Sequence, residues 1–208
     1  MIDPKGTWTA QEGGDGGPKS VRLAKEGDAW RVTHLQRTGY PELHGVGFTY
    51  KGFLCIARGL VQQAADLGDV VGLVKYDITQ FGELPAAWYH CSLNGQLSTG
   101  LSSGGPSTSL LGEYRADYSS GDGAAFNPLR KTISMEGDAM RFAWWDDERF
   151  HYLGIGQMVA GSLFAAWGPP GALVQFAFYD LDTEDGTLQG QWWDLGRSFS
   201  GSETLIKI

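Results

Sequence analysis

The stretch Glu26–Arg31 reads EGDAWR, and it returns 110 residues later at Glu136–Arg141 as EGDAMR. The Gly-Val-Gly of residues 45–47 returns as Gly-Ile-Gly at residues 154–156, with an offset of 109. A nearly constant offset along a chain is typical of a duplicated unit. The sequence therefore predicts two similar units, and the positions at which they differ become the places to look for function.

Composition and turn signals indicate that both units are all-β. The chain has 31 glycines and 8 tryptophans, with 42% hydrophobic and 19% charged residues. Gly-Asp, Asn-Gly and Asp-Gly pairs, which suit tight hairpin turns, recur about every ten residues between short aromatic and β-branched runs. Each unit is thus expected to be an antiparallel meander of seven or eight short strands.

Such a meander has to protect its edge strands, and closure into a barrel does so completely. We expect two small barrels, one in residues 1–101 and one in residues 109–208. Residues 102–108 have the Ser- and Gly-rich composition of a linker. A sandwich is the main alternative, and a single larger barrel or sheet shared by both units is a further one.

Charge and hydropathy limit the classes of partner. The net charge is −8 and the isoelectric point is near 4.9, so nucleic acid and anionic membranes are not expected partners. No apolar stretch approaches the roughly 20 residues that cross a bilayer, and the first residues lack the pattern of a signal peptide. We therefore expect a cytoplasmic protein without a membrane segment, and leave open whether it forms homo-oligomers.

Two short patterns resemble known barrel proteins. Gly6-Thr7-Trp8 opens the first unit, and Gly112-Glu113-Tyr114 opens the second. A Gly-x-Trp on the first strand is similar to the start of calycin barrels, the lipocalin and avidin-like proteins, in which the tryptophan closes one end. The repeated Gly, Tyr-Asp and Trp pattern also resembles small bacterial β-barrel proteins of unassigned function. The resemblance implies a ligand-binding barrel, but it carries over no site residue.

His34 is the first candidate that emerges when matched positions of the two units are compared. It alternates with Trp30 and Val32 on one face of a predicted strand, and the matching position in the second unit is Trp144. An inward imidazole can act as a general base or bind a ligand. The alternative is a core histidine bonded to a backbone carbonyl.

Arg58 is the second candidate. It alternates with Leu54 and Ile56, and its counterpart is Trp167. A buried guanidinium needs a carboxylate partner, from the protein or from a ligand. The alternative is that the strand emerges at the rim and Arg58 reaches water.

The predicted ligand-binding set draws only on the first unit. His44, which matches Leu153, joins it as another polar replacement. The full set is His34, His44, Arg58, Trp30, Trp88 and Tyr50, with His34 and Arg58 the only weak candidates for catalysis.

Other residues of chemical interest receive structural interpretations. Cys55 and Cys91 occur only in the first unit, so we expect buried thiols rather than a disulfide. Tyr76-Asp77 and Tyr179-Asp180 occur in both units, which predicts a structural role such as a hydroxyl that satisfies a turn. No phosphate loop, dinucleotide fingerprint, nucleophile elbow or metal-ligand spacing is present, so neither a cofactor nor a metal is expected.

These observations lead to one expected function and two alternatives. The first is the binding of a small, largely apolar molecule, or one that bears a carboxylate, in a barrel cavity. The second is a barrel enzyme of the isomerase or cyclase type that uses polar groups of the first unit. The third is a protein-interaction module with exposed tryptophans. The sequence leaves open whether the protein is an enzyme.

Overall fold

The described residues form sixteen antiparallel strands, eight in each sequence repeat. The computed structural model of the chain describes residues 1–11, 20–35, 42–60, 71–91, 95–196 and 199–208. The strands of the first repeat are β1 (Gly6–Gln11), β2 (Ser20–Glu26), β3 (Ala29–Leu35), β4 (Leu43–Tyr50), β5 (Phe53–Leu60), β6 (Gly72–Asp77), β7 (Leu84–His90) and β8 (Ser98–Ser103). Those of the second are β9 (Gly112–Ser119), β10 (Leu129–Glu136), β11 (Ala139–Trp145), β12 (Phe150–Val159), β13 (Ser162–Gly168), β14 (Leu173–Asp180), β15 (Leu188–Asp194) and β16 (Phe199–Lys207).

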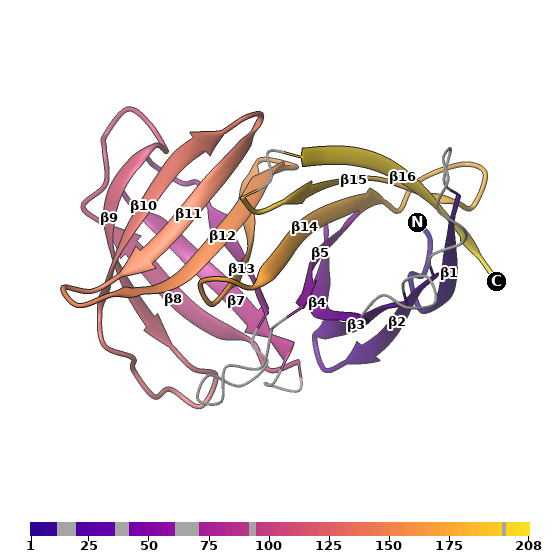
Figure 1. The fold of residues 1–208 in the computed structure, drawn as a ribbon, viewed down its shortest axis with the longest axis horizontal. Coiled ribbons are helices and arrows are strands. Elements are labelled where there is room, and N and C mark those ends of the chain that lie inside the picture. The colour runs from indigo at the N-terminus through magenta and orange to yellow at the C-terminus, as the bar shows by residue number, and fades with distance from the viewer. Residues whose placement is uncertain (12–19, 36–41, 61–70, 92–94, 197–198) are drawn as a thin grey trace.

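The strands close into two eight-stranded antiparallel barrels that lie side by side (Figure 1). We call β6 to β13 the central barrel, because these strands follow one another in the middle of the chain. We call the other the terminal barrel, because it joins β1 to β5 with β14 to β16 and holds both chain ends. In both barrels consecutive strands pair as neighbours, so the expected all-β, two-barrel architecture is confirmed.

The barrels do not coincide with the sequence repeats. Each repeat contributes five strands to one barrel and three to the other, because β5 pairs with β14 and β13 pairs with β6. The boundaries 1–101 and 109–208 therefore describe the repeats, and neither half closes a barrel by itself. Since β6 and β14 are equivalent strands, each can replace the other beside the fifth strand of a repeat. The predicted linker also begins too early, because Ser102 and Ser103 end strand β8.

Three buried clusters result from this arrangement. One fills the terminal barrel around Trp8, Trp30 and Leu54. A second fills the central barrel around Tyr76 and Phe142. A third lies between the barrels and unites outward-facing side chains of both. Its members include Ala29, Phe48, Cys55, Tyr89, Ala139, Phe164, Phe176 and Trp193.

The repeated Glu-Gly-Asp-Ala motif lies at this junction. Gly27 and Gly137 have φ of 57° and 63°, the left-handed conformation that a two-residue hairpin turn requires. The second motif accepts two hydrogen bonds from the segment of the terminal barrel. Trp193 Nε1 donates to Asp138 Oδ1 at 3.1 Å, and the Gly196 amide donates to Glu136 Oε1 at 3.0 Å. The motif that reveals the duplication thus also takes part in the contact between the two barrels.

Several smaller expectations are also settled. Cys55 and Cys91 form no disulfide, and Cys55 is buried as expected whereas Cys91 is only half-buried. Trp8 is fully buried, and its indole Nε1 donates to the Pro4 carbonyl at 2.8 Å. In the described part of the chain, no helix is long and apolar enough to span a bilayer.

Candidate functional site

Arg58 lies inside the terminal barrel and is fully paired by the protein. It is 2% exposed, and its guanidinium donates to Gln175 Oε1 at 2.8 Å, to the Tyr179 hydroxyl at 3.2 Å and to Glu203 Oε1 at 3.0 Å. The carboxylate that the sequence requires is therefore Glu203, a side chain of β16. The alternative of a solvated rim residue is wrong, and no ligand acid is needed opposite Arg58.

Arg58 and Glu203 each favour the charged form of the other. Burial opposes ionisation of Glu203, but the Arg58 charge and the Tyr179 hydroxyl outweigh it and hold the pKa of Glu203 below its ordinary value. Burial also opposes the charge of Arg58, and its neighbours Tyr179 and Glu203 raise its pKa. Arg58 and Glu203 are thus a stable internal ion pair.

The other first-repeat candidates are scattered. His34 is 3% exposed inside the terminal barrel, where it lies near enough to Glu203 to influence its pKa. Trp30 fills the same interior. His44 is exposed, with its side chain beside Glu42, and the Tyr50 hydroxyl bonds Ser162 at the junction of the barrels. His34 and Trp30 thus share the interior of the terminal barrel with Arg58, whereas His44 and Tyr50 lie outside this interior.

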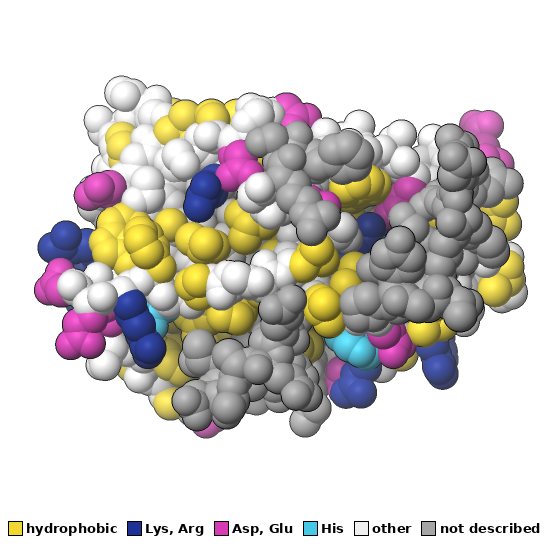
Figure 2. Space-filling view, viewed as in Figure 1, with side chains coloured by type: hydrophobic (Ala, Val, Ile, Leu, Met, Phe, Trp, Pro, Cys, Tyr) yellow, Lys and Arg dark blue, Asp and Glu magenta, His cyan; other side chains and the backbone are white. Residues whose placement is uncertain are grey.

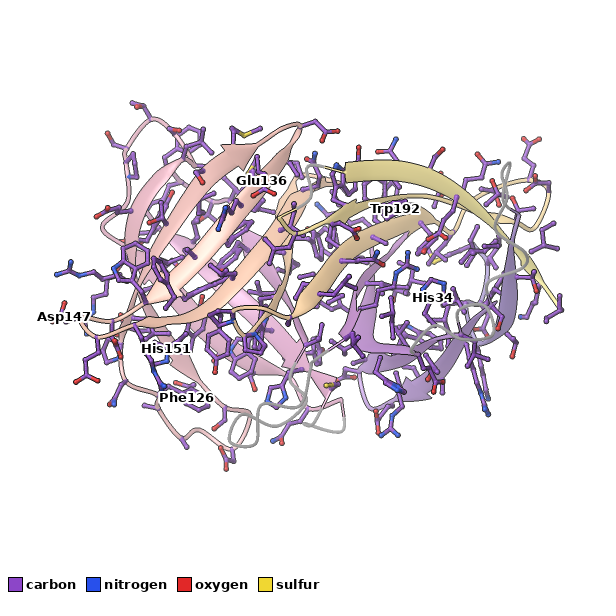
Figure 3. All side chains as sticks on the ribbon, viewed as in Figure 1. His34, Phe126, Glu136, Asp147, His151 and Trp192 are labelled. Atoms are coloured by element: carbon purple, nitrogen blue, oxygen red, sulfur yellow. The ribbon has the colours of Figure 1, made fainter. Side chains whose placement is uncertain are left out.

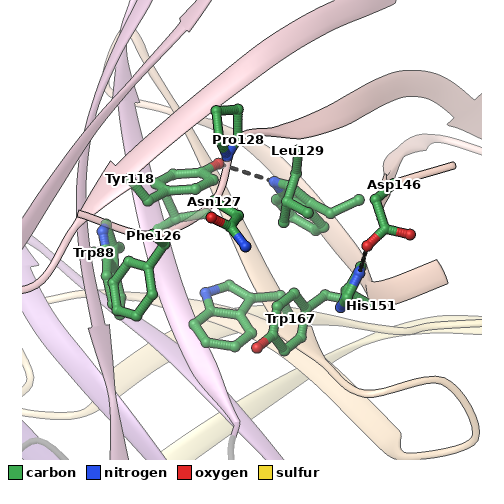
Figure 4. A pocket seen from close by; sticks show the side chains of 12 residues that line it. Trp88, Tyr118, Phe126, Asn127, Pro128, Leu129, Asp146, His151 and Trp167 are labelled. Atoms are coloured by element: carbon green, nitrogen blue, oxygen red, sulfur yellow. Dashed lines mark hydrogen bonds and ion pairs between the residues drawn. The ribbon is translucent and has the colours of Figure 1, made fainter. Parts of the chain in front are cut away.

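Among the described residues, a cavity opens in the central barrel. It has a volume of about 420 Å³ and is lined mainly by aromatic side chains from several strands. Figure 4 shows these rings around a common space. Of the predicted set only Trp88 lines it. The lining residues are Val74, Trp88, Tyr118, Phe126, Asn127, Pro128, Leu129, Trp144, Asp146, His151, Tyr152 and Trp167.

Two glycines make room for the large rings of this cavity. A Cβ on Gly72 would lie 2.1 Å from the Trp167 indole, and a Cβ on Gly100 would lie 2.3 Å from the Tyr118 ring. Each ring therefore lies across a strand at a point where only glycine fits. The Tyr118 hydroxyl then receives the Trp144 indole N–H at 2.9 Å and bonds the Tyr76 hydroxyl at 2.8 Å. This network holds two walls of the cavity in place.

The repeated tyrosines have a structural role, but not at a turn. Tyr76 bonds Tyr118 inside the central barrel, and Tyr179 bonds Arg58 and Glu203 inside the terminal barrel. Both tyrosines are completely buried. Each barrel therefore uses the same inward tyrosine to organise a different polar network.

His151 and Asp146 form a hydrogen-bonded pair at the edge of the cavity. His151 Nε2 lies 2.5 Å from Asp146 Oδ2, and Asp146 Oδ1 accepts the backbone N–H groups of Glu148 and Arg149. These bonds, that of His151 first, lower the pKa of Asp146 to about 2. In Figure 3 His151 and Phe126 lie at the central barrel, far from His34 in the terminal barrel. The cavity thus has one fixed carboxylate and one imidazole at its edge.

Lys131 is a second buried cation, and it belongs to the central barrel. It has no exposed surface, its Nζ donates to Ser102 Oγ at 2.7 Å, and it lies 3.8 Å from the centre of the Tyr76 ring and 4.9 Å from that of Tyr114. Burial lowers its pKa well below the ordinary lysine value. None of these partners lines the cavity, so Lys131 lies apart from the ligand-accessible space.

The candidate residues predicted from the sequence belong to the first repeat, and of these only Trp88 lines the cavity. His151 is the one histidine of the sequence outside the first repeat. Lys131 occupies the position that matches Val21, so a comparison of the two units could have identified it. The cavity combines Val74 and Trp88 from the first repeat with a majority of residues from the second, because the barrel contains strands of both repeats. In the described ranges, no three His, Cys, Asp or Glu side chains are grouped to hold a metal ion.

Comparison with known proteins gives no relative. No protein-family model, no curated protein and no solved structure matches the chain. The function has to be argued from the geometry of the site.

Proposed function

We propose that the protein binds a small, largely apolar molecule in the aromatic cavity of the central barrel. The observation that carries the proposal is the cavity itself. Its volume of about 420 Å³ falls in the range of roughly 300–1,000 Å³ that is usual for small-molecule sites, which are mostly apolar with a few polar groups. The likeness of Gly6-Thr7-Trp8 to calycin barrels, many of which hold ligands, agrees with this proposal.

The walls of the cavity are exposed in a way that fits ligand entry. Phe126 is 51% exposed although it contacts Trp88, with ring centres 6.0 Å apart. Hydrophobic side chains also gather on the visible face of the central barrel (Figure 2). A ligand that enters between Phe126 and His151 would cover aromatic surface that otherwise faces water, which favours binding.

Gly72→Ala tests the proposal with a single methyl group. The new Cβ would overlap Trp167, so we expect the indole to move, a stability loss of about 1–3 kcal/mol and at least a tenfold weaker affinity for the neutral fluorescent probe 1-aminoanthracene. Fluorescence titration of the folded variant measures that affinity.

Gln175→Ala is the matched control, because Gln175 occupies the equivalent position in the terminal barrel. It should leave probe binding unchanged. A wild-type protein that does not bind the probe, or a Gly72→Ala protein that binds it as well as wild type, would contradict the proposed site.

A second candidate function rests on the His151–Asp146 pair. A histidine oriented by a carboxylate at the edge of an apolar cavity is suited to accept a proton from a bound molecule, as an isomerase requires. His151→Gln separates the two functions: it should abolish turnover of any substrate while leaving probe binding in place. An unaltered turnover rate in that variant would exclude His151 as the base.

A further inference from the structure

We infer that the central-barrel cavity selects an organic cation, a quaternary or tertiary ammonium group attached to an apolar body, over neutral and anionic molecules of the same shape. The inference rests on the proposed ligand-binding function and names the chemical class of the ligand. It follows from the orientation of the aromatic rings, from the charges of the lining and from the location of the nearest buried cation.

The rings of the cavity meet at steep angles. Tyr152 and Trp167 are edge-on at 71° with centres 4.9 Å apart, Trp88 and Trp167 meet at 67°, and Trp88 and Tyr118 meet at 82°. In an edge-to-face contact one ring turns its edge to the face of its neighbour. The ring that offers its edge keeps both of its own faces uncovered by that contact, so rings in this arrangement can form the walls of a box. The face of an aromatic ring carries partial negative charge and attracts a cation within about 6 Å of its centre.

Stacked rings elsewhere in the molecule show the contrast. At the junction of the barrels Trp193 is nearly parallel to Phe176 and Phe178, at 23° and 26°. There each ring covers the face of the next. Two rings of the cavity lining are stacked on a neighbour, Trp88 on His90 at 14° and Trp144 on Phe142 at 17°. One face of each of these indoles is therefore covered, while the edge-on contacts of Trp88 form the box.

The formal charge of the lining is acidic or neutral. Asp146 is the single carboxylate of the cavity lining in the described structure, and neither lysine nor arginine is part of it. The low pKa of Asp146 keeps it ionised. With the net charge of −8 on the whole chain, the cavity attracts cations and repels anions.

Lys131 does not offset this preference. Its Nζ is held by Ser102 and by the faces of Tyr76 and Tyr114, none of which lines the cavity. Burial also favours its neutral form. The cavity therefore contains negative ring faces, one carboxylate and the His151 imidazole that is bonded to this carboxylate, whereas the buried lysine lies outside it.

The test compares two molecules of the same shape that differ in charge. Benzyltrimethylammonium carries a quaternary nitrogen where neopentylbenzene carries a quaternary carbon. Competition against 1-aminoanthracene measures the affinity of each for the wild-type protein. We expect the cation to bind about tenfold more tightly, the effect of one favourable cation–π site, and its affinity to fall with added salt while that of neopentylbenzene does not.

Asp146→Asn tests the contribution of the carboxylate charge, because it removes the charge and keeps the shape of the side chain. The amide oxygen can still accept the Glu148 and Arg149 amides, so the turn is preserved, and we expect the cation to lose several-fold in affinity while the neutral molecule is unaffected. Asp147→Asn is the matched control, because Asp147 is 91% exposed, is absent from the lining and faces Arg130 at 3.7 Å. It should change neither affinity. The salt dependence of the wild type gives the same information if Asp146→Asn does not fold.

The outcomes distinguish this inference from the proposed function. If neopentylbenzene binds as tightly as the cation or more tightly, the preference for a cation is wrong and the apolar site stands. If neither the two molecules nor the probe binds, the proposed function fails as well.

Discussion

The central and terminal barrels share one strand plan but use their interiors differently. At three matched positions the terminal barrel has Arg58, Gln175 and Glu203, whereas the central barrel has Trp167, Gly72 and Gly100. In the terminal barrel Arg58 and Glu203 form an ion pair, and Gln175 accepts a further hydrogen bond from Arg58. In the central barrel the two glycines make room for Trp167 and Tyr118, which line a cavity.

The difference shows that one duplicated fold can hold a paired charge in one barrel interior and leave a cavity in the other. The terminal barrel contains both ends of the chain, and within it Glu203 compensates the buried charge of Arg58. The central barrel exposes aromatic surface at its end and retains a buried lysine that has no carboxylate within 4.0 Å among the described residues. Polar residues in a barrel interior thus do not identify the binding site, because a buried charge that the protein pairs internally needs no ligand to compensate it.

The largest expected effect tests which strands form each barrel. Phe178 lies directly opposite Cys55 across β5 and β14, at a spacing that a disulfide can bridge. Phe178→Cys should therefore form a disulfide with Cys55 when the protein is refolded under oxidising conditions. Mass spectrometry of a non-reduced digest detects the cross-linked peptides.

Lys75→Cys is the control, because Lys75 is the equivalent residue on β6. If residues 1–101 closed a barrel by themselves, Lys75 would lie opposite Cys55. In the structure its neighbour is Phe164, so we expect no cross-link. A disulfide in Lys75→Cys and none in Phe178→Cys would overturn the exchange of strands between the repeats.

The next effect concerns the ion pair of the terminal barrel. Glu203→Gln leaves the buried charge of Arg58 uncompensated, so we expect a loss of about 3–5 kcal/mol in the free energy of unfolding, measured with urea at pH 7. Because the pKa of Glu203 is lowered in the fold, its contribution is present above the ordinary pKa of glutamate. It is lost as the pH falls through the lower pKa of the folded state.

The double replacement Arg58→Leu with Glu203→Leu removes both charges and should recover most of the lost stability. The probe affinity of the central barrel should be unchanged in both variants. A weaker probe affinity in Glu203→Gln that remains folded would show that the two interiors are coupled.

The smallest effect concerns the buried lysine of the central barrel. Lys131→Met keeps a similar length and removes the amine, and we expect a stabilisation on the order of 1 kcal/mol at pH 7. Burial lowers the pKa of Lys131 below its ordinary value of 10.5, so the unfolded chain binds more protons than the folded protein between the lowered pKa and 10.5. The stability of wild type should rise with pH toward 10.5 relative to the variant. A difference between the two proteins that is independent of pH would show that Lys131 stays protonated in the fold.

The sequence predicted the strands, the duplication and the inward face of Arg58, because these follow from local alternation and from matched residues. It could not predict that β5 pairs with β14, since β6 and β14 carry the same pattern and compete equally for the same partner. The cavity was missed for a related reason. Trp88, Trp144 and Trp167 were visible as aromatic residues, but only the closure of the barrel shows that they share one space with His151.

The central claim is that the ligand site lies in the central barrel and not beside Arg58 and His34. Two-dimensional NMR of the tryptophan indole N–H groups tests it directly, because Trp88 and Trp167 line the cavity and Trp8 and Trp30 fill the terminal barrel. On addition of 1-aminoanthracene we predict large shifts for Trp88 and Trp167 and none for Trp8 and Trp30. Shifts confined to Trp8 and Trp30 would contradict the account.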